Sequence, residues 1–409
     1  VDLHRRAALA IEILYAENLQ PHIELLARHY DLGDDAEKAI HYLLLAGQQA
    51  RAVYLNQEAR LHYERVLKRL EALEATESNL KQRLEALHAL GEIQTMLDNL
   101  EEAEAYLRQV ITLATELDLP PRQRVHYILS LCQFYGSTGD ISAQVEQCER
   151  GMTLIADINA PVELVALTTY LATAYANRGD WRSAISRVGT IIDILPTLPY
   201  SGHLIDTWFY AVLWCRLTKQ PERGFNLIDP VIDEALRRRD FWSAGQLHLL
   251  PKLFLCETVG DGQAAFATIN EALRFAEITG DKKTIRGCWY WLGVYHSWMY
   301  GNLDEAERYA TITLEDRSNL YRPSSYVFAS TVLGLVHYCR HDWGQALEWL
   351  ERSFGLAKSD GLLVDGVRRG IVGLAWTYTM LDRKAEGLAL LAKIAREEEL
   401  HIESWPTVA

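Results

Sequence analysis

A short polar turn recurs along this chain at an almost constant interval. In the clearest copies an Asp or Asn is followed four residues later by Ala, as in the phrases GDWRSA and HDWGQA. The turn positions are Asn99, Asp140, Asp180, Gln220, Asp261, Asn302, Asp342 and Arg383, and successive positions lie 40 or 41 residues apart. This regularity predicts an array of stacked repeats rather than one globular core.

Each copy is typical of a place where one helix ends and the next begins. An Asp or Asn before an apolar-periodic stretch can cap a helix, because its side chain accepts a hydrogen bond from the first-turn amides. At Asn99 and Asn302 an acid three residues later fits a capping box. In four copies a Gly precedes the capping residue and can adopt the left-handed conformation that ends a helix. The Ala is expected to face the preceding helix and let the two backbones approach closely.

The residues before each turn form a second pattern of a large, a small and an aromatic residue. Leu171, Ala172 and Tyr175 before Asp180 are an example. This order resembles the tetratricopeptide repeat over about residues 20 to 400. The resemblance implies an all-α fold in which helix pairs form a right-handed superhelix. The usual repeat is about 34 residues long, so a period of 40 to 41 predicts longer helices or longer connections.

Prolines agree with the expected helix boundaries. Four stand where helices should begin, the position at which a missing amide does least harm: Pro121, Pro161, Pro221 and Pro323. Two others, Pro230 and Pro251, fall inside expected helices and should bend them.

The first part of the chain is less regular. We expect residues 1–75 to form an irregular helical segment that merges without a linker into a repeat array over residues 76–405. The phrases LARHY, KAIHYLLLAG and EARLHYERVL occur in this order within residues 3–73. They resemble the segment that follows the nucleotide-binding region in bacterial STAND-type signal-transduction ATPases, which include multidomain cyclases, kinases and transcription activators.

That resemblance implies an ATPase module upstream, with the helical array as its sensor or partner-binding arm. The chain itself contains no G-x-x-x-x-G-K-[ST] sequence, and it begins without Met in helical periodicity. We therefore interpret it as a segment of a longer bacterial protein.

Composition and charge exclude several other classes. A net charge of −14 argues against a general binder of nucleic acid or of anionic membranes. No apolar run reaches the length of about 20 residues that a membrane span needs. The six cysteines have neither zinc-site spacing nor the density of a disulfide framework, so we expect reduced, buried thiols in a cytoplasmic protein.

No pattern in the chain indicates catalysis. Neither an H-E-x-x-H, a G-x-S-x-G nor a G-x-G-x-x-G sequence occurs. His337 and His341 share a helix face, but a metal site there would need a third ligand, and a helix C-terminus explains both residues. We expect no catalytic residue, no metal and no cofactor, and hence a chain that is not an enzyme.

Aromatic residues offer the strongest indication of a binding surface. All eleven tryptophans lie between residues 181 and 405. In tetratricopeptide repeats the first helix of each pair lines the concave face, and counting back from the turns places six residues on that face. They are Phe209, Arg216, Trp291, Tyr295, Trp298 and Tyr338. These residues either form an aromatic groove or fill the core between the longer helices.

Two functional hypotheses follow. The first is a non-catalytic interaction or ligand-sensing domain that regulates a larger signalling ATPase through the concave face of the superhelix. The second is a free-standing scaffold or chaperone-like adaptor. In both, the expected partner is a protein or peptide segment, or a small ligand. Neither hypothesis involves nucleic acid or a membrane.

Overall fold

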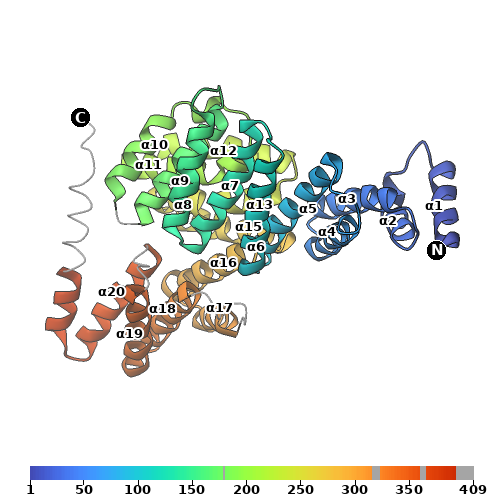
Figure 1. Ribbon diagram of the computed structural model, residues 1–409. Helices are drawn as coiled ribbons and strands as arrows, with labels where there is room; N and C mark the ends of the chain where they lie inside the picture. The colour runs from blue at the N-terminus through green and yellow to red at the C-terminus, as the bar shows by residue number, and fades with distance from the viewer. Residues whose placement is uncertain (178–179, 316–322, 360–364, 393–409) are drawn as a thin grey trace. The chain divides into compact units, whose positions relative to one another are not determined.

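Every regular element of the computed structural model is helical (Figure 1). The structure describes residues 1–177, 180–315, 323–359 and 365–392, and no strand occurs in these ranges. Contacts divide the chain into two compact units. Unit 1 comprises Val1–Arg178, Thr197–Asp206 and Ile278–Asp281, and unit 2 comprises Gly179–Pro196, Thr207–Glu277 and Lys282–Ala409.

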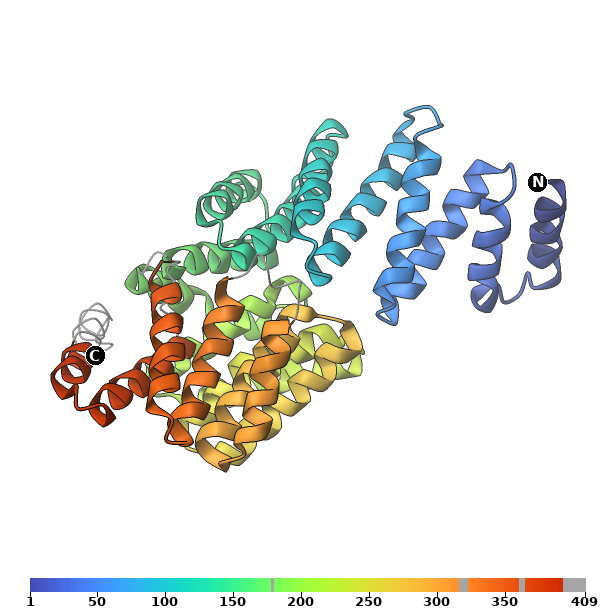
Figure 2. The ribbon, with the colours of Figure 1, turned by 90° about the horizontal axis from the view of Figure 1, so that it is seen from below.

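Unit 1 is built from helices that each pack on the next one in the chain, which Figure 2 shows as a stack from blue to green. Its elements are α1 (Asp2–Leu14), η1 (Gln20–His22), α2 (Ile23–Asp31), α3 (Ala36–Ala52), α4 (Asn56–Leu70), α5 (Glu77–Met96), α6 (Leu100–Glu116), α7 (Pro121–Thr138), α8 (Ile141–Ile155), α9 (Pro161–Asn177) and η3 (Gly202–Leu204). Among the first helices of successive pairs, α5 also contacts α7, and α7 contacts α9. Such neighbour-to-neighbour packing is the defining property of a repeat array.

Unit 2 is likewise built from helices. Its elements are α10 (Trp181–Ile191), α11 (Ile205–Leu217, whose first two residues belong to unit 1), α12 (Pro221–Arg237), α13 (Phe241–Leu247), η4 (His248–Lys252), α14 (Leu253–Thr258), α15 (Gly262–Thr279), α16 (Lys282–Tyr295), η5 (His296–Tyr300), α17 (Leu303–Glu315), α18 (Pro323–Cys339), α19 (Trp343–Ser359) and α20 (Asp365–Met380). A short η2 (Leu195–Thr197) has residues assigned to both units, and residues 384–392 are helical. Helix α18 packs against α16, α17, α19 and α20.

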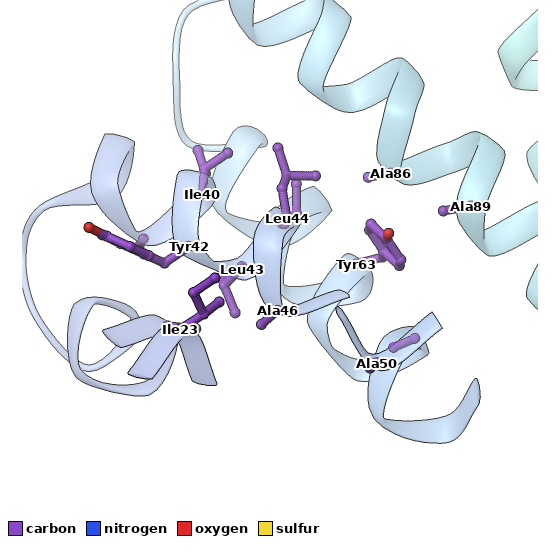
Figure 3. Packing of buried hydrophobic residues seen from close by; sticks show 14 of the residues in the cluster. Ile23, Ile40, Tyr42, Leu43, Leu44, Ala46, Ala50, Tyr63, Ala86 and Ala89 are labelled. Carbon is purple, nitrogen blue, oxygen red and sulfur yellow. The ribbon is translucent and has the colours of Figure 1, made fainter. Parts of the chain in front are cut away.

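A continuous buried cluster joins the first five helices of unit 1. It extends from Ala8 to Leu97 and so passes across residue 75. Figure 3 shows Tyr63 beside Ala86 and Ala89 of α5. The expected boundary between residues 75 and 76 has no counterpart in this cluster and remains a prediction.

The predicted turns agree with the structure in five of the copies. Asp140, Asp180, Asp261, Asn302 and Asp342 each accept a hydrogen bond from the amide three residues later, at 2.9 to 3.3 Å. The capping box expected at Asn99 is wrong. The side-chain amide of Asn99 donates a hydrogen bond to Oε1 of Gln94 at 2.7 Å, and the Asn99 side chain accepts none from the first-turn amides of α6.

Glycines and prolines take the predicted places. Gly139, Gly260 and Gly301 have positive φ angles of 82°, 77° and 63°, while Gly179 lies outside the described residues. The four boundary prolines are each the first residue of a helix, α7, α9, α12 and α18. Pro230 lies inside α12, and Pro251 lies in η4, a π-helical turn that separates α13 from α14.

Helix length explains the long period. Helices α5, α6, α7 and α8 contain 20, 17, 18 and 15 residues, and α6 is joined to α7 by residues 117–120 alone. In these repeats the extra residues lengthen the helices, whereas α10 has only 11 residues and is joined to α11 by the longer stretch 192–204. The predicted small residues are buried to within 1% exposure: Ala103, Ala184, Ala265, Ala306 and Ala346. The all-α superhelical repeat fold predicted from the sequence is confirmed.

Two substitutions on α6 test the close helix packing. Ala103 is fully buried and Ala105 is exposed on the same helix. Ala103→Leu overfills the contact with the neighbouring helix and should lower the free energy of unfolding by about 1–3 kcal/mol. Ala105→Leu should change it by less than about 0.5 kcal/mol. Equal urea midpoints for the two variants would contradict the packing role of Ala103.

His248 predicts a pH dependence of stability. Burial lowers the pKa of His248 to about 4, and nearby Lys252 adds to the effect. The folded chain therefore keeps this imidazole neutral, whereas the unfolded chain protonates it near pH 6.5. Lowering the pH from 7 to 4 should favour unfolding by up to about 3 kcal/mol through this group. In urea denaturation at pH 7 and pH 4.5, His248→Gln should lose less stability than the wild type; an equal loss would argue against the assignment.

Candidate aromatic binding site

Three aromatic side chains from three elements meet on unit 2. Trp298 of η5 stacks on Trp376 of α20, with ring centroids 5.8 Å apart and planes inclined by 26°. Tyr338 of α18 lies 6.1 Å from the same Trp376 ring. Trp376 keeps 46% of its surface exposed, which is unusual for so large an apolar side chain.

A shallow pocket of about 250 Å³ opens beside these rings. It is lined by Tyr338, Trp376, Thr379 and Met380. Met380 is also half exposed, at 49%. We call Trp298 together with the four lining residues the aromatic site.

Two glycines hold α20 close enough to α18 to form this site. A Cβ atom added to Gly370 would lie 2.9 Å from the Thr331 side chain, and one added to Gly373 would lie 2.7 Å from that of Leu335. A side chain at either position would force the Thr331 or Leu335 side chain to shift, so Gly at these positions favours the close approach of α20 to α18. The next turn of α20 then places Trp376 beside Tyr338.

A π-helical turn sets the direction of Trp298. Helix α16 ends at Tyr295, and η5 continues it with wider turns until Gly301 ends the helix. A π-helical turn contains more residues than an α-helical one and so rotates the side chains that follow it. As a result Trp298 is half-buried at the aromatic site, although α-helical spacing would align it with Trp291 of the core.

The chemistry of the aromatic site is apolar. No ionised side chain lines the pocket among the described residues, and burial raises the pKa of Tyr338, which keeps its phenol protonated. Flat aromatic faces and a methionine suit an apolar or aromatic anchor group, with the Tyr and Thr hydroxyls as polar contacts. The described residues contain no cluster of three or more His, Cys, Asp or Glu side chains able to hold a metal ion.

The six predicted site residues fall into three groups. Trp298 and Tyr338 lie at the aromatic site. Phe209 and Arg216 lie elsewhere in unit 2, where the Arg216 guanidinium stands 5.1 Å from the Phe254 ring and Phe209 is packed against the core.

The placement of Trp291 and Tyr295 on an open groove is wrong. Trp291 is 5% exposed and Tyr295 is 2% exposed, and both belong to the core between α14, α16 and α18. Their contacts are with core side chains: Trp291 packs edge-on against Phe254, and Tyr295 donates a hydrogen bond to Glu257 at 3.0 Å. These two residues therefore follow the alternative given in the sequence analysis: their large rings fill the core between the long helices.

Trp376 was not among the predicted residues. It lies seven positions before Arg383, as Tyr295 lies seven positions before Asn302. The repeat spacing could therefore have identified Trp376 as a site residue. It was missed because Arg383 marks one of the weaker copies of the turn. Position within the repeat also could not show that Trp376 is exposed where Tyr295 is buried.

Two further findings concern the cysteines and the hydropathy of the helices. All six cysteines are free thiols, five of them buried. None of the described helices combines the length and the apolar character that crossing a membrane requires.

Comparison with known proteins shows a likeness of fold. No family model and no curated protein sequence matches the chain. A Rap protein complexed with competence and sporulation factor superposes with a TM-score of 0.57 at 12% identity, covering 90% of this chain and 99% of that chain. Human IFIT1 with m7Gppp-AAAA gives a TM-score of 0.49 at 14% identity, covering 97% and 94%.

A third solved structure is a STAND protein with a tetratricopeptide repeat sensor from Pyrococcus horikoshii. Its TM-score is 0.40 at 12% identity, covering 85% of this chain and 53% of that chain. At such identities the likeness concerns the fold alone, and of the three the one to the Rap protein carries weight. The fold therefore places this chain in the class of tetratricopeptide-like helical repeat proteins.

The difference in burial between Trp291 and Trp376 can be tested by measuring the free energy of unfolding of two variants. Trp291→Ala empties a core position and should lower the free energy of unfolding by about 3–5 kcal/mol. Trp376→Ala removes a half-exposed ring and should cost less than about 1 kcal/mol. Urea denaturation followed by far-ultraviolet circular dichroism measures both. A loss at Trp376 as large as that at Trp291 would mean that Trp376 is a core residue and not a surface one.

Proposed function

We propose that this chain is a non-catalytic interaction domain that binds an apolar segment of a protein or peptide at the aromatic site. The observation that carries this proposal is the half-exposed pair of Trp376 and Met380 beside the ring of Tyr338. Contiguous exposed apolar side chains on a folded domain mark interaction sites more often than isolated ones do. Tryptophan and tyrosine also dominate the energy of protein interfaces.

The fold supports a role in recognition. A repeat array presents an extended surface whose side chains vary without disturbing the core, because each repeat is stabilised by its neighbours. The Rap protein that shares this fold was solved in complex with competence and sporulation factor. An array of this fold can therefore hold such a factor, and we extend this capacity to the present chain.

We further propose that binding regulates an attached ATPase of the STAND type. The support is the resemblance of residues 3–73 to the segment that follows the nucleotide-binding region in those proteins. A partner that binds one curvature of the array better than another would shift its conformational equilibrium and so change the state of the attached module. A free-standing scaffold or adaptor is the alternative, and the coding sequence upstream of Val1 decides between them. A P-loop module within a few hundred residues supports regulation, whereas a start codon directly before Val1 excludes it.

Peptide selection tests the aromatic site directly and needs no purified partner protein. A displayed library of random peptides is selected against the purified chain, and the affinities of the enriched peptides are measured by fluorescence anisotropy. Trp376→Ala should weaken the binding of peptides that use this site by tenfold or more, because aromatic anchors contribute about 2 kcal/mol or more to an interface.

Tyr300→Ala is the matched control. Tyr300 is an aromatic residue exposed to a similar extent, 47%, but it packs against Phe266 and does not line the pocket. Peptides that bind the Trp376→Ala and wild-type chains equally well, or that lose affinity only with Tyr300→Ala, would overturn the assignment of the aromatic site.

A further inference from the structure

The aromatic site follows one position of the repeat through successive copies. Trp298, Tyr338 and Thr379 each lie four residues before the turn position of their own repeat. They belong to η5, α18 and α20, and α18 packs against both of the other elements. Trp376, one turn before Thr379, joins the row through its contacts with Trp298 and Tyr338. The site is therefore a row of side chains that crosses several helices and does not run along a single one.

A further ring extends this row beyond the pocket. Trp343, the first residue of α19, has its ring 5.2 Å from that of Tyr338. The exposed His341 lies next to it, with the two ring centroids 5.0 Å apart. Tyr338 thus contacts tryptophans from both α19 and α20. Rings from four elements, η5, α18, α19 and α20, form one continuous aromatic surface.

The polar groups of this surface are mainly hydrogen-bond donors. A tryptophan indole N–H can only donate, and a tyrosine hydroxyl carries a proton that it can donate. Among the described residues, neither the indole N–H of Trp298 nor the hydroxyl of Tyr338 has a hydrogen-bond partner, and neither atom is buried, so both are open to a ligand. The hydroxyl of Thr379 already donates to the carbonyl oxygen of Ala375 at 3.0 Å. No carboxylate lines the described pocket to accept a bond in return.

These donors distinguish between the possible backbones of a ligand. An α-helical ligand pairs its own N–H and C=O groups and has little use for them. An extended strand presents N–H and C=O groups alike, and its N–H groups would find no acceptor in the pocket. A proline-rich segment in the polyproline II conformation lacks N–H groups at its prolines and has no internal hydrogen bonds, so its carbonyl oxygens are free to accept. Of the three backbones, the last complements the site.

The spacing of the row also suits such a segment. Polyproline II has three residues per turn, so every third side chain returns to the same face after about 9.3 Å. Packed helices lie about 8–10 Å apart, and α18 is packed directly against η5 and α20. Every third residue of the segment can therefore meet the next repeat. The pocket of about 250 Å³ between Tyr338 and Trp376 then receives one apolar side chain.

We propose that the aromatic site binds a proline-rich segment of another protein in the polyproline II conformation, laid across η5, α18 and α20. This inference rests on the proposed function, because it names the kind of segment that the same site takes. Proline rings stack on the flat faces of Trp298, Tyr338 and Trp376, and the carbonyl oxygens between them accept from the indole and phenol groups. Because no ionised side chain lines the described pocket, the segment is uncharged where it enters.

The experiment measures the binding of three fluorescein-labelled peptides by fluorescence anisotropy. One peptide consists of four Pro-Leu-Pro repeats, and the other two replace every proline by alanine or by threonine, which restores the backbone N–H groups. The proline peptide should bind at least about tenfold more tightly than either, because its conformation is already formed before binding. Trp298→Ala should weaken its binding by about tenfold or more. Tyr338→Phe, which keeps the ring and removes the donor, should weaken it about three- to tenfold, and Tyr300→Ala should leave it unchanged.

Equal affinities of the three peptides, or binding of the proline peptide that Trp298→Ala leaves intact, would overturn the proline-rich assignment. If selected library peptides depend on Trp376 while the proline peptide does not bind, that assignment is wrong and the proposed interaction site stands. If no peptide of either kind depends on Trp376, both proposals fail. Thermal unfolding shows whether each variant is folded. Should Trp298→Ala be unfolded, Trp298→Leu replaces it, because leucine keeps the apolar bulk but has neither the flat face nor the donor.

Discussion

The close approach of neighbouring helices is the constraint on which the rest of the structure depends. Five of the repeats place an alanine where the second helix meets the first, and these alanines are buried to within 1% exposure. Glycines serve the same purpose on the first helices. A Cβ atom on Gly91 would lie 2.7 Å from Leu107, and one on Gly334 would lie 2.4 Å from Leu350. Because the helices are long, one such contact per pair sets the spacing of many residues on either side.

This local packing separates stability from recognition. A residue in the interior of a repeat contacts only the adjacent repeats, so side chains elsewhere on the helices can vary without disturbing the fold. At the aromatic site, helix α20 contributes both to stability and to the binding surface. Its Gly370 and Gly373 pack on α18, while Trp376, one turn later, remains half exposed. The π-helical turn η5 adds to this by directing Trp298 to the site and leaving Trp291 in the core.

The sequence predicted the architecture better than the site. The repeat period, the caps at Asp140 and Asp342 and the prolines that begin α7 and α18 all depend on neighbouring residues, and these predictions hold. The inner-face assignment failed at Trp291 and Tyr295, because counting along an ideal helix ignores both the π-helical turn and the bulk of the facing helices. The cap predicted at Asn99 failed as well, because the side chain of Asn99 is hydrogen-bonded to the side chain of Gln94 and not to the helix amides.

The sequence alone determined where helices begin and end, which small residues they require and how long each repeat is. These properties are local, because a cap, a proline or a left-handed glycine acts within one turn of the chain. Only the tertiary structure decided which aromatic rings are covered and which side chains meet. Trp298 and Trp376 come from repeats almost eighty residues apart. Their contacts depend on how successive helices pack, and no short stretch of sequence contains that information.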